Sequence, residues 1–432
     1  MGVGRAQGPM LQVWGTIWCI KIRLTDHYFV NLCIYGMREM MRRTILSTLI
    51  GFLICGFSLA GCATAPVIPV AEQQVFAWQT ASLAEVGIDE QPLTEVVASI
   101  HAGSYPNVHS ILIVKDGKLV FEEYFSGYAW DYDGDDFKGE LIDFDAHTQH
   151  NLASVTKSFT SALIGITIDK GFILGVDEKV FSFFPEYDGL RDERKDKLTL
   201  EHLLTMTSGL EWNGMDVPVS TRDTRNDLIQ LFLVDDPVAY VLGKPVVDEP
   251  GAHWYYNGGG TNVLGEVIRE ATGTRMDEFA EKNLFAPLGI TDYEWDFINP
   301  DVIHASGNLS LRPRDMAKFG YVYLNDGIWQ GERIISADWI RNSTQAHAIT
   351  PWTTGYGYQW WLATYQSGPH TFDSFYADGW GGQRIMVFSE LDMVVVFTGG
   401  NYVEGNPVDE IIVRYILLQS CLEVALDLKI YM

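Results

Sequence analysis

The 432-residue sequence has few basic residues and lacks the common hydrolase and zinc signatures. It holds 30 Lys and Arg against 56 Asp and Glu, a formal charge of −26. This balance argues against nucleic-acid binding, because phosphates would be repelled. There is no Gly-x-Ser-x-Gly elbow, so the α/β-hydrolase fold is not supported. Neither His-x-His nor His-Glu-x-x-His occurs, which argues against zinc hydrolysis.

Calcium binding is also disfavoured. An Asp-x-Asp-x-Asp run begins at Asp131, in an acidic segment over residues 128–145. A calcium loop needs glycine and glutamate where this sequence has Asp136 and Ile142. The segment is therefore predicted to be a solvated acidic loop, and we expect neither a metal nor an organic cofactor.

Residues 1–61 are predicted to be a leader. A basic segment at 41–44 precedes an apolar run at 45–60, and Leu59-Ala60-Gly61 leads to Cys62. The run is shorter than the roughly 20 apolar residues of a spanning helix, which disfavours an uncleaved membrane anchor. The pattern resembles a bacterial lipoprotein signal. The resemblance implies cleavage before Cys62, lipidation of its thiol, and anchoring in the bacterial cell envelope, on the periplasmic side and at the outer membrane.

The leader also changes the expected start and the cysteine inventory of the chain. A secretory signal belongs at the N-terminus, so residues 1–36 are predicted not to be translated or not to be part of the fold. Translation would begin at Met37, Met40 or Met41. The mature chain of 371 residues would have a charge of −30 and only two cysteines, Cys62 and Cys421. No internal disulfide would then be possible, so a large core must stabilise the fold.

The mature chain is predicted to hold a tether at 62–78 and one domain at 79–432. An apolar strand at 110–114, an Asp-Gly turn and a strand at 119–125 predict a hairpin. A buried helix is predicted at 154–169, and a mainly helical insertion at about 172–300. Strands at 356–362, 384–388 and 393–398 and a helix at 408–425 follow. The fold class is α/β (α+β), an antiparallel sheet flanked by N- and C-terminal helices.

Three short motifs could carry chemistry. Ser154-x-x-Lys157 opens the buried helix, where residues three apart share a face, so the ammonium can reach the hydroxyl. Tyr255-x-Asn257 could supply a phenol and an amide, and Tyr256 is read as a packing aromatic. Residues 377–383 are rich in glycine beside a strand, where a backbone N–H could complete an oxyanion hole. Taken singly, each motif also has a purely structural explanation. The first could be a helix cap, the second a packed aromatic loop and the third a tight turn.

Together, in this order, the motifs resemble the serine β-lactamase and penicillin-binding protein superfamily. The most similar group is the class C β-lactamase-related one, with esterases, D-amino-acid peptidases and 6-aminohexanoate-dimer hydrolases. Segments 115–120, 198–210 and 312–320 also resemble this group, and the match covers about residues 80–425. The resemblance implies a β-lactamase-like fold.

The resemblance also implies roles. Ser154 would be the acylated nucleophile, and Lys157 would help to deprotonate it. Tyr255 would be the general base in acylation and the proton donor to the leaving group, and Asn257 would hold Lys157 and the substrate. The implied oxyanion and substrate-binding group is Ser154, Asp378, Gly379 and Trp380.

One departure bears on the substrate. β-Lactamases and penicillin-binding proteins carry Lys-Thr-Gly where this chain has Ala377-Asp378-Gly379. An aspartate there would repel the carboxylate of a β-lactam. We therefore expect a serine hydrolase of the carboxylesterase type, acting on a small-molecule ester or amide. The alternatives are a D-amino-acid peptidase or amidase, a weak β-lactamase, and a catalytically silent envelope protein that binds a partner.

Overall fold

The computed structural model describes residues 76–403 and 405–417, and the backbone of three strands near the N-terminus. The chain divides into two units, Met1–Gln73 and Gln74–Met432. In the first unit, β1 (Val13–Trp14), β2 (Ile17–Thr25) and β3 (Tyr28–Ile34) form an antiparallel sheet. Cys62, Cys421 and most of the predicted tether lie outside the described residues. Within the described residues, no helix has the length and apolar character needed to cross a membrane.

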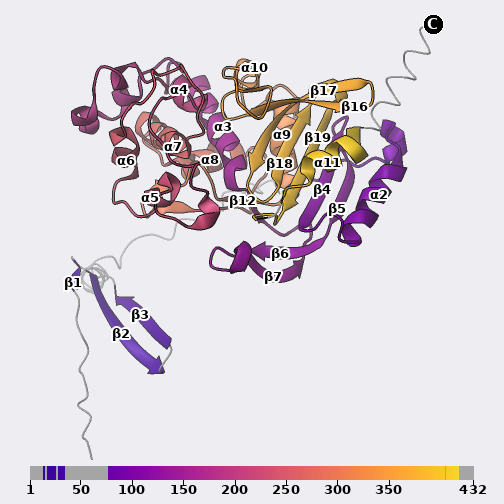
Figure 1. Ribbon diagram of the computed structural model, residues 1–432, viewed down its shortest axis with the longest axis horizontal. Helices are drawn as coiled ribbons and strands as arrows, with labels where there is room; N and C mark the ends of the chain where they lie inside the picture. The colour runs from indigo at the N-terminus through magenta and orange to yellow at the C-terminus, as the bar shows by residue number, and fades with distance from the viewer. Residues whose placement is uncertain (1–12, 15–16, 26–27, 35–75, 404, 418–432) are drawn as a thin grey trace, which may run out of the picture. The chain divides into compact units, whose positions relative to one another are not determined.

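The second unit is built around a seven-stranded sheet in the order β15-β16-β17-β18-β19-β4-β5 (Figure 1). Every neighbouring pair in it is antiparallel. The strands are β4 (Val108–Lys115), β5 (Lys118–Tyr124), β15 (Gly355–Tyr356), β16 (Trp361–Ser367), β17 (His370–Gly379), β18 (Gln383–Phe388) and β19 (Met393–Gly399). The first and last segments of the domain thus meet at β4 and β19, as the predicted α/β class requires.

The predicted hairpin is confirmed at β4–β5. Its turn residues Asp116 and Gly117 have φ of 52° and 73°, the left-handed conformation that a two-residue Asp-Gly turn adopts. Burial continues along β4, because Ile111 and Ile113 belong to one apolar cluster and Leu112 and Val114 to another. Alternate side chains of a strand point to opposite faces, so the sheet is covered on both.

Helices from both ends of the domain cover those faces. On one face, α2 (Glu90–His101) packs near α11 (Val408–Ile411) and the helical turn η10 (Ile412–Leu417). On the other face, α9 (Pro313–Leu324) lies against β18 and β19, and the aromatic ring of Phe319 stacks on Phe159 of α3 (Thr156–Asp169) at 3.7 Å between centroids. The buried helix predicted after residue 154 is therefore present.

A mainly helical region lies beside the sheet (Figure 1). Its longest helix, α7, packs on α3 and begins directly after the Tyr-x-Asn motif. The helices are α4 (Leu200–Leu204), α5 (Asp227–Leu231), α6 (Pro237–Gly243), α7 (Gly258–Thr272) and α8 (Met276–Ala280). This arrangement places the start of α3, the start of α7 and the end of β17 around one site.

Three predicted elements are wrong in detail. Residues 128–145 are not an open loop, because β6 (Ser126–Trp130) and β7 (Lys138–Asp143) pair and the side chain of Phe137 is buried. The strand predicted at 356–362 is interrupted, because Gln359 has a φ of 63° and turns the chain between β15 and β16. The closing helix changes its hydrogen-bond pattern after Ile411, and residues 418–425 lie outside the described residues.

Candidate active site

Ser154 sits in a constrained turn at the start of α3. The preceding residue, Ala153, has a φ of 45°, a conformation that costs energy for a residue with a Cβ. Two hydrogen bonds hold it: the Ala153 N–H donates to Asn151 Oδ1 at 2.8 Å, and the Thr156 hydroxyl donates to the Ala153 carbonyl at 2.7 Å. The strain is therefore compensated locally, and Ser154 is fixed before the first helical turn.

Lys157 lies on the next turn, as the Ser-x-x-Lys spacing predicts. Its Nζ is 3.0 Å from Ser154 Oγ and donates to the Ser306 carbonyl at 2.6 Å. The side chain is only 3% exposed, and this burial lowers the pKa of Lys157 to about 7. A neutral amine that accepts a proton is therefore available near pH 7.

This pKa leads to a pH dependence. Below about pH 7 Lys157 is protonated and cannot take a proton from Ser154, so kcat/KM is expected to fall about tenfold per pH unit. Above that value the amine is neutral and the rate should level off. A profile of kcat/KM from pH 5 to 9 would check this, and a rate that falls as the pH rises through 7 would contradict it.

The carbonyl that holds Lys157 is itself positioned by α7. The Ser306 N–H donates to Asn262 Oδ1 at 3.0 Å, and Asn262 Nδ2 donates to Ser306 Oγ at 3.1 Å. His304 Nε2 lies 3.1 Å from the same hydroxyl, and burial together with the nearby Lys157 lowers the pKa of His304 to about 3. Sequence reasoning missed Ser306, Asn262 and His304, because no motif links residue 306 to residue 157.

The structure places Tyr256, not Tyr255, beside Ser154 and Lys157. The Tyr256 phenol and the Ser154 hydroxyl form a hydrogen bond, and Lys157 Nζ lies 4.9 Å from the centroid of the Tyr256 ring. Burial raises the pKa of Tyr256 above its usual range, so the phenol stays protonated. Tyr255 is 38% exposed, and its hydroxyl lies 3.3 Å from Asp216. The prediction of Tyr255 as general base therefore does not fit this geometry.

Asn257 also differs from its predicted place. Its Oδ1 accepts the Gly260 N–H at 3.0 Å, so the side chain caps the N-terminus of α7. Its Nδ2 is buried and has no partner among the described residues. Lys157 donates instead to the Ser306 carbonyl, a partner that the sequence did not predict. An asparagine directly before a glycine-rich helix start is a typical cap, and that signal was present in the sequence.

The third motif reaches the site at the end of β17. A Cβ on Gly379 would lie 2.2 Å from the Leu152 carbonyl oxygen, so this strand approaches the Ser154 turn at backbone distance. Trp380 is anchored by its indole N–H, which donates to the Tyr402 carbonyl at 2.7 Å. The end of β17 thus lies beside the Ser154 turn, where the N–H groups of Ser154 and Trp380 were predicted to hold an oxyanion.

Substituting this glycine tests the close approach. Gly379→Ala is expected to lower kcat by about 10- to 100-fold, because the methyl group must push β17 away from residue 152. Gly175→Ala is the control, since a Cβ there meets nothing within 4 Å. Steady-state kinetics of both variants would check the difference. An unchanged kcat in a folded Gly379→Ala protein would contradict the close approach.

Asp378 forms an ion pair with a neighbour that it shares with a second carboxylate. Its Oδ1 lies 2.6 Å from Nε of Arg384, which also pairs with Asp409. The Arg384 side chain is only 9% exposed, and burial, the largest single influence, lowers its pKa. The negative charges around it, led by Asp378 and Asp409, together outweigh burial and hold the pKa of Arg384 above its ordinary value. The argument that Asp378 repels an anionic substrate is therefore weaker than the sequence suggested, because a buried guanidinium offsets its charge.

A loop from the helical region is attached on two sides of this site. At one attachment, Asp216 contacts the Tyr255 hydroxyl beside Tyr256. At the other, the Arg222 guanidinium donates to the carbonyls of Tyr132 and Gly134 and lies 4.4 Å from the centroid of the Phe137 ring, which packs on Trp380. The loop therefore links the tyrosine motif to the third motif.

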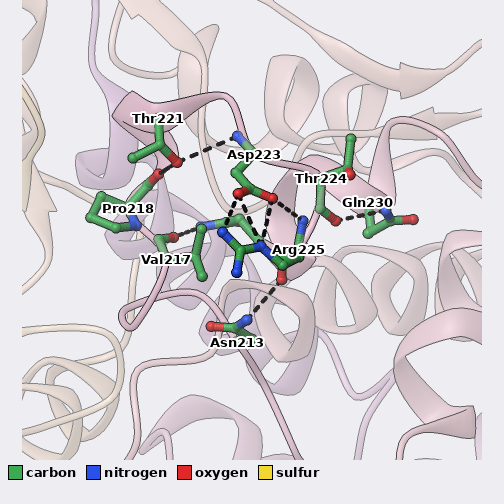
Figure 2. A network of polar contacts seen from close by, with 9 residues as sticks. Asn213, Val217, Pro218, Thr221, Asp223, Thr224, Arg225 and Gln230 are labelled. Carbon is green, nitrogen blue, oxygen red and sulfur yellow. Dashed lines mark hydrogen bonds and ion pairs between the residues drawn. The ribbon is translucent and has the colours of Figure 1, made fainter.

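Figure 2 shows how the loop is ordered internally. Asp223 pairs with Arg225, and Asn213 Nδ2 donates to the Arg225 carbonyl at 2.8 Å. The Thr221 hydroxyl donates to the Pro218 carbonyl at 2.7 Å. These bonds shape the loop but do not tie it to the β6–β7 hairpin, which depends on Arg222.

Arg222 and Arg225 therefore form a matched pair. Arg222→Ala is expected to release the loop from the hairpin, raise its rate of proteolysis, and raise kcat/KM for bulky substrates relative to small ones by about 3- to 10-fold. Arg225→Ala removes only an exposed ion pair within the loop, which solvent screens, so it should change neither the rate of proteolysis nor the selectivity. Limited proteolysis and a series of substrates of increasing size would check both variants. Equal selectivity in the two would contradict a restraining role for Arg222.

Aromatic rings form one wall beside Tyr256. Its ring stacks near Trp361 at 5.8 Å between centroids, and Trp254 lies 5.6 Å from Trp361. Trp352 is 59% exposed and packs edge-on against Trp254. Trp360, in contrast, is fully buried in the core. The wall offers an apolar surface close to the reacting groups.

Known proteins resemble this chain at two levels. A family model described as Beta-lactamase matches residues 103–414. A monacolin J acid methylbutanoyltransferase from Aspergillus terreus is 31% identical over 168 residues, which cover 35% of this chain and 39% of the relative. The chain thus spans about two fifths of the length of the first curated relatives that it matches.

Solved structures share the fold at low identity. A protein from Bacillus anthracis assigned as a 6-aminohexanoate-dimer hydrolase has a TM-score of 0.62 at 23% identity, covering 81% of this chain and 89% of that one. A family VIII carboxylesterase has a TM-score of 0.57 at 19% identity, covering 75% of this chain and 96% of that one. The likeness extends over the sheet and the helical region together.

Proposed function

Since the chain belongs to the Beta-lactamase family, we propose that it is a serine hydrolase that works through an acyl-enzyme on Ser154. The observation that carries the proposal is the contact of Lys157 Nζ with Ser154 Oγ at 3.0 Å, by an amine whose pKa burial lowers to about 7. A serine hydroxyl is a weak nucleophile until a neighbouring base takes its proton. Lys157 is placed and tuned to be that base.

The proposed reaction assigns each proton transfer to a named group. Ser154 Oγ passes its proton to neutral Lys157 and bonds to the carbonyl carbon of the substrate. The N–H groups of Ser154 and Trp380 hold the oxyanion that forms. When the carbon–leaving-group bond breaks, the Tyr256 hydroxyl gives its proton to the leaving group and recovers one from Lys157. Lys157, neutral again, then takes a proton from water, whose oxygen bonds to the acyl carbon. It returns that proton to Ser154 Oγ as the bond between Oγ and the acyl carbon breaks.

The proposed substrate is a small carboxylic ester with an apolar part. The aromatic wall of Trp254, Trp352 and Trp361 favours an apolar group, and the third motif lacks the lysine that would attract a carboxylate. A methylbutanoyltransferase and a carboxylesterase are among the similar proteins, which supports an acyl group as part of the substrate. Amides of D-amino acids are the second candidate, because the same acyl-enzyme can form from them.

A fluorophosphonate probe tests the nucleophile. Intact mass should show one adduct on the wild-type chain, and peptide mapping should place it on Ser154. Ser154→Ala should show none. Ser161→Ala is the matched control on the same helix, since its buried hydroxyl has no partner among the described residues and its loss should change nothing. No adduct on folded wild-type protein, or an undiminished one in Ser154→Ala, would contradict the proposal and favour a silent binding protein.

The substrate class needs a separate measurement. We expect kcat/KM for p-nitrophenyl butyrate to exceed that for a D-alanyl-p-nitroanilide and for nitrocefin by about 100-fold or more. A higher value for the anilide would favour the amidase, and a higher value for nitrocefin would favour a β-lactamase.

We also propose that the mature chain is a lipoprotein of the bacterial cell envelope, anchored through Cys62. The support is the sequence pattern of basic, apolar and small residues before Cys62. Metabolic labelling with an alkyne palmitate during bacterial expression should mark the chain. Cys62→Ser should abolish the label and Cys55→Ser, within the apolar run, should keep it. A label that survives Cys62→Ser would overturn the proposal.

A further inference from the structure

An acidic cavity of about 780 Å³ opens in the helical region, apart from the proposed catalytic residues. Its walls come from the turn η5 (Pro185–Leu190), from α6 and α7, and from β10 (Phe297–Asn299) and β11 (Val302–Ile303). One guanidinium, that of Arg269, lines it. The lining carboxylates are those of Glu186, Asp235, Asp236, Glu266, Glu270 and Asp301. The cavity therefore carries a clear excess of negative charge.

Glu266 is the unusual member of this group. The residue is 6% exposed, and its Oε1 is buried without a hydrogen-bond partner among the described residues. Its Oε2 lies 3.4 Å from Nη1 of Arg269, which also donates to the Asp301 carbonyl. A buried carboxylate oxygen without a donor is costly. A ligand that brings an N–H donor and positive charge would remove that cost.

Neighbouring charges also act on the Glu266 carboxyl group. Burial is the main reason why the pKa of Glu266 rises to about 7, and the negative charges of Glu270 and Asp301 raise it further against the opposing Arg269. The negative charges of Glu270 and Asp301 therefore act on Glu266. Asp236 is partly satisfied, because it accepts a hydrogen bond from the Tyr187 hydroxyl at 2.9 Å.

The arrangement excludes one class of cation and fits another. Among the residues that the structure describes, no three acidic, histidine or cysteine side chains converge closely enough to hold a metal ion. The charges are instead spread over a cavity whose walls include Phe232, Leu233 and Ile298, and Phe232 and Leu233 are 42% and 63% exposed. Spread negative charge with apolar surface between suits a chain of methylenes with ammonium groups along it.

We propose that this cavity is a binding site for a linear aliphatic di- or polyamine. One ammonium group pairs with the Glu266 carboxyl group, whose side chain turns so that the buried Oε1 faces the cavity and gains the missing partner. A second ammonium lies near Asp301 or Glu270, and the methylenes between them pack on Phe232 and Ile298. Charge-assisted hydrogen bonds of this kind are stronger than neutral ones, and the site does not depend on hydrolysis at Ser154.

Isothermal titration of the full chain with spermidine tests the site. We expect saturable binding to one site, an affinity for butylamine at least about tenfold weaker, and a further loss of at least about tenfold for spermidine in Glu266→Gln. Asp301→Asn should weaken binding by about 3- to 10-fold and guards against a folding defect in the first variant. Glu332→Gln removes an exposed carboxylate on β14 (Glu332–Arg333), outside the cavity, and should bind as wild type.

Two controls distinguish this site from the catalytic cleft and from a metal site. Protein labelled at Ser154 by the fluorophosphonate should bind spermidine unchanged, and lost binding would place the amine in the catalytic cleft instead. Titration at equal ionic strength with Mg²⁺ should not compete beyond screening. No saturable binding, equal binding by Glu266→Gln, or full competition by Mg²⁺ would overturn the proposal.

Discussion

Tyr256→Phe is expected to lower kcat by about 10²- to 10⁴-fold, the range of a lost general acid or base, while Tyr255→Phe leaves kcat within about twofold. The two substitutions remove the same hydroxyl from adjacent residues, so each is the control for the other. Of the two tyrosines, Tyr256 is the one whose hydroxyl forms a hydrogen bond with Ser154 and whose ring lies 4.9 Å from Lys157 Nζ. The Tyr255 hydroxyl contacts Asp216 on an exposed loop.

The measurement is single-turnover and steady-state kinetics on one p-nitrophenyl ester and one amide. The amide should suffer the larger loss in Tyr256→Phe, because an amine leaving group needs a proton and p-nitrophenolate does not. The fluorophosphonate adduct should still form slowly, which shows that the fold and Ser154 are intact. Equal losses in the two variants, or a loss only in Tyr255→Phe, would return the role to Tyr255.

Tyr255 and Tyr256 show which features of the site the sequence could predict and which it could not. Apolar runs at 111–114 in β4, 385–388 in β18 and 393–397 in β19 predict buried strands. The Asp-Gly turn has one favoured geometry, so these elements follow from local residues. The contact between Ser154 and Lys157 follows from the helical repeat, because residues three apart share one face of a helix. The choice between Tyr255 and Tyr256 depends on where α7 begins, because a shift of one residue before a helix turns the opposite side chain inward. Asn257 as the helix cap fixes that register.

The remaining features of the site depend on contacts between distant parts of the chain. The Ser306 carbonyl that holds Lys157 is 149 residues away in the sequence, and its place depends on Asn262. Arg384 offsets Asp378 because two adjacent strands bring them together at the paired positions 378 and 384. No local pattern predicts which carbonyl or which guanidinium will arrive. The motifs therefore predicted that Ser154 and Lys157 lie together, and tertiary packing selected their partners.

Lys157→Met is expected to lower kcat by about 10³-fold or more and, at the same time, to stabilise the fold. Holding a lysine with a pKa of about 7, against an ordinary 10.5, costs about 4 kcal/mol at pH 7. Methionine fills a similar volume without that cost. The Ser306 carbonyl loses its donor, which takes back about 1–3 kcal/mol. The net gain is about 1–3 kcal/mol, or roughly 2–6 °C in Tm.

The gain should depend on pH in a defined direction. Between pH 7 and 10.5 the unfolded chain binds the proton and the folded one does not, so the stability of the wild type rises with pH across this window. The advantage of Lys157→Met is therefore largest at or below pH 7 and disappears between about pH 8 and 10. Near pH 10.5 only the lost donor to the Ser306 carbonyl remains, so the wild type should be the more stable protein there. Lys195→Met is the control, since Lys195 is also buried but lies outside the site, and it should leave kcat unchanged. Thermal unfolding of the wild type and of Lys157→Met at pH 7 and 10 measures the sign of this difference. A Lys157→Met protein that is less stable than wild type at pH 7 would contradict the prediction. Lys157 would then be held as an ammonium group and would not be the base.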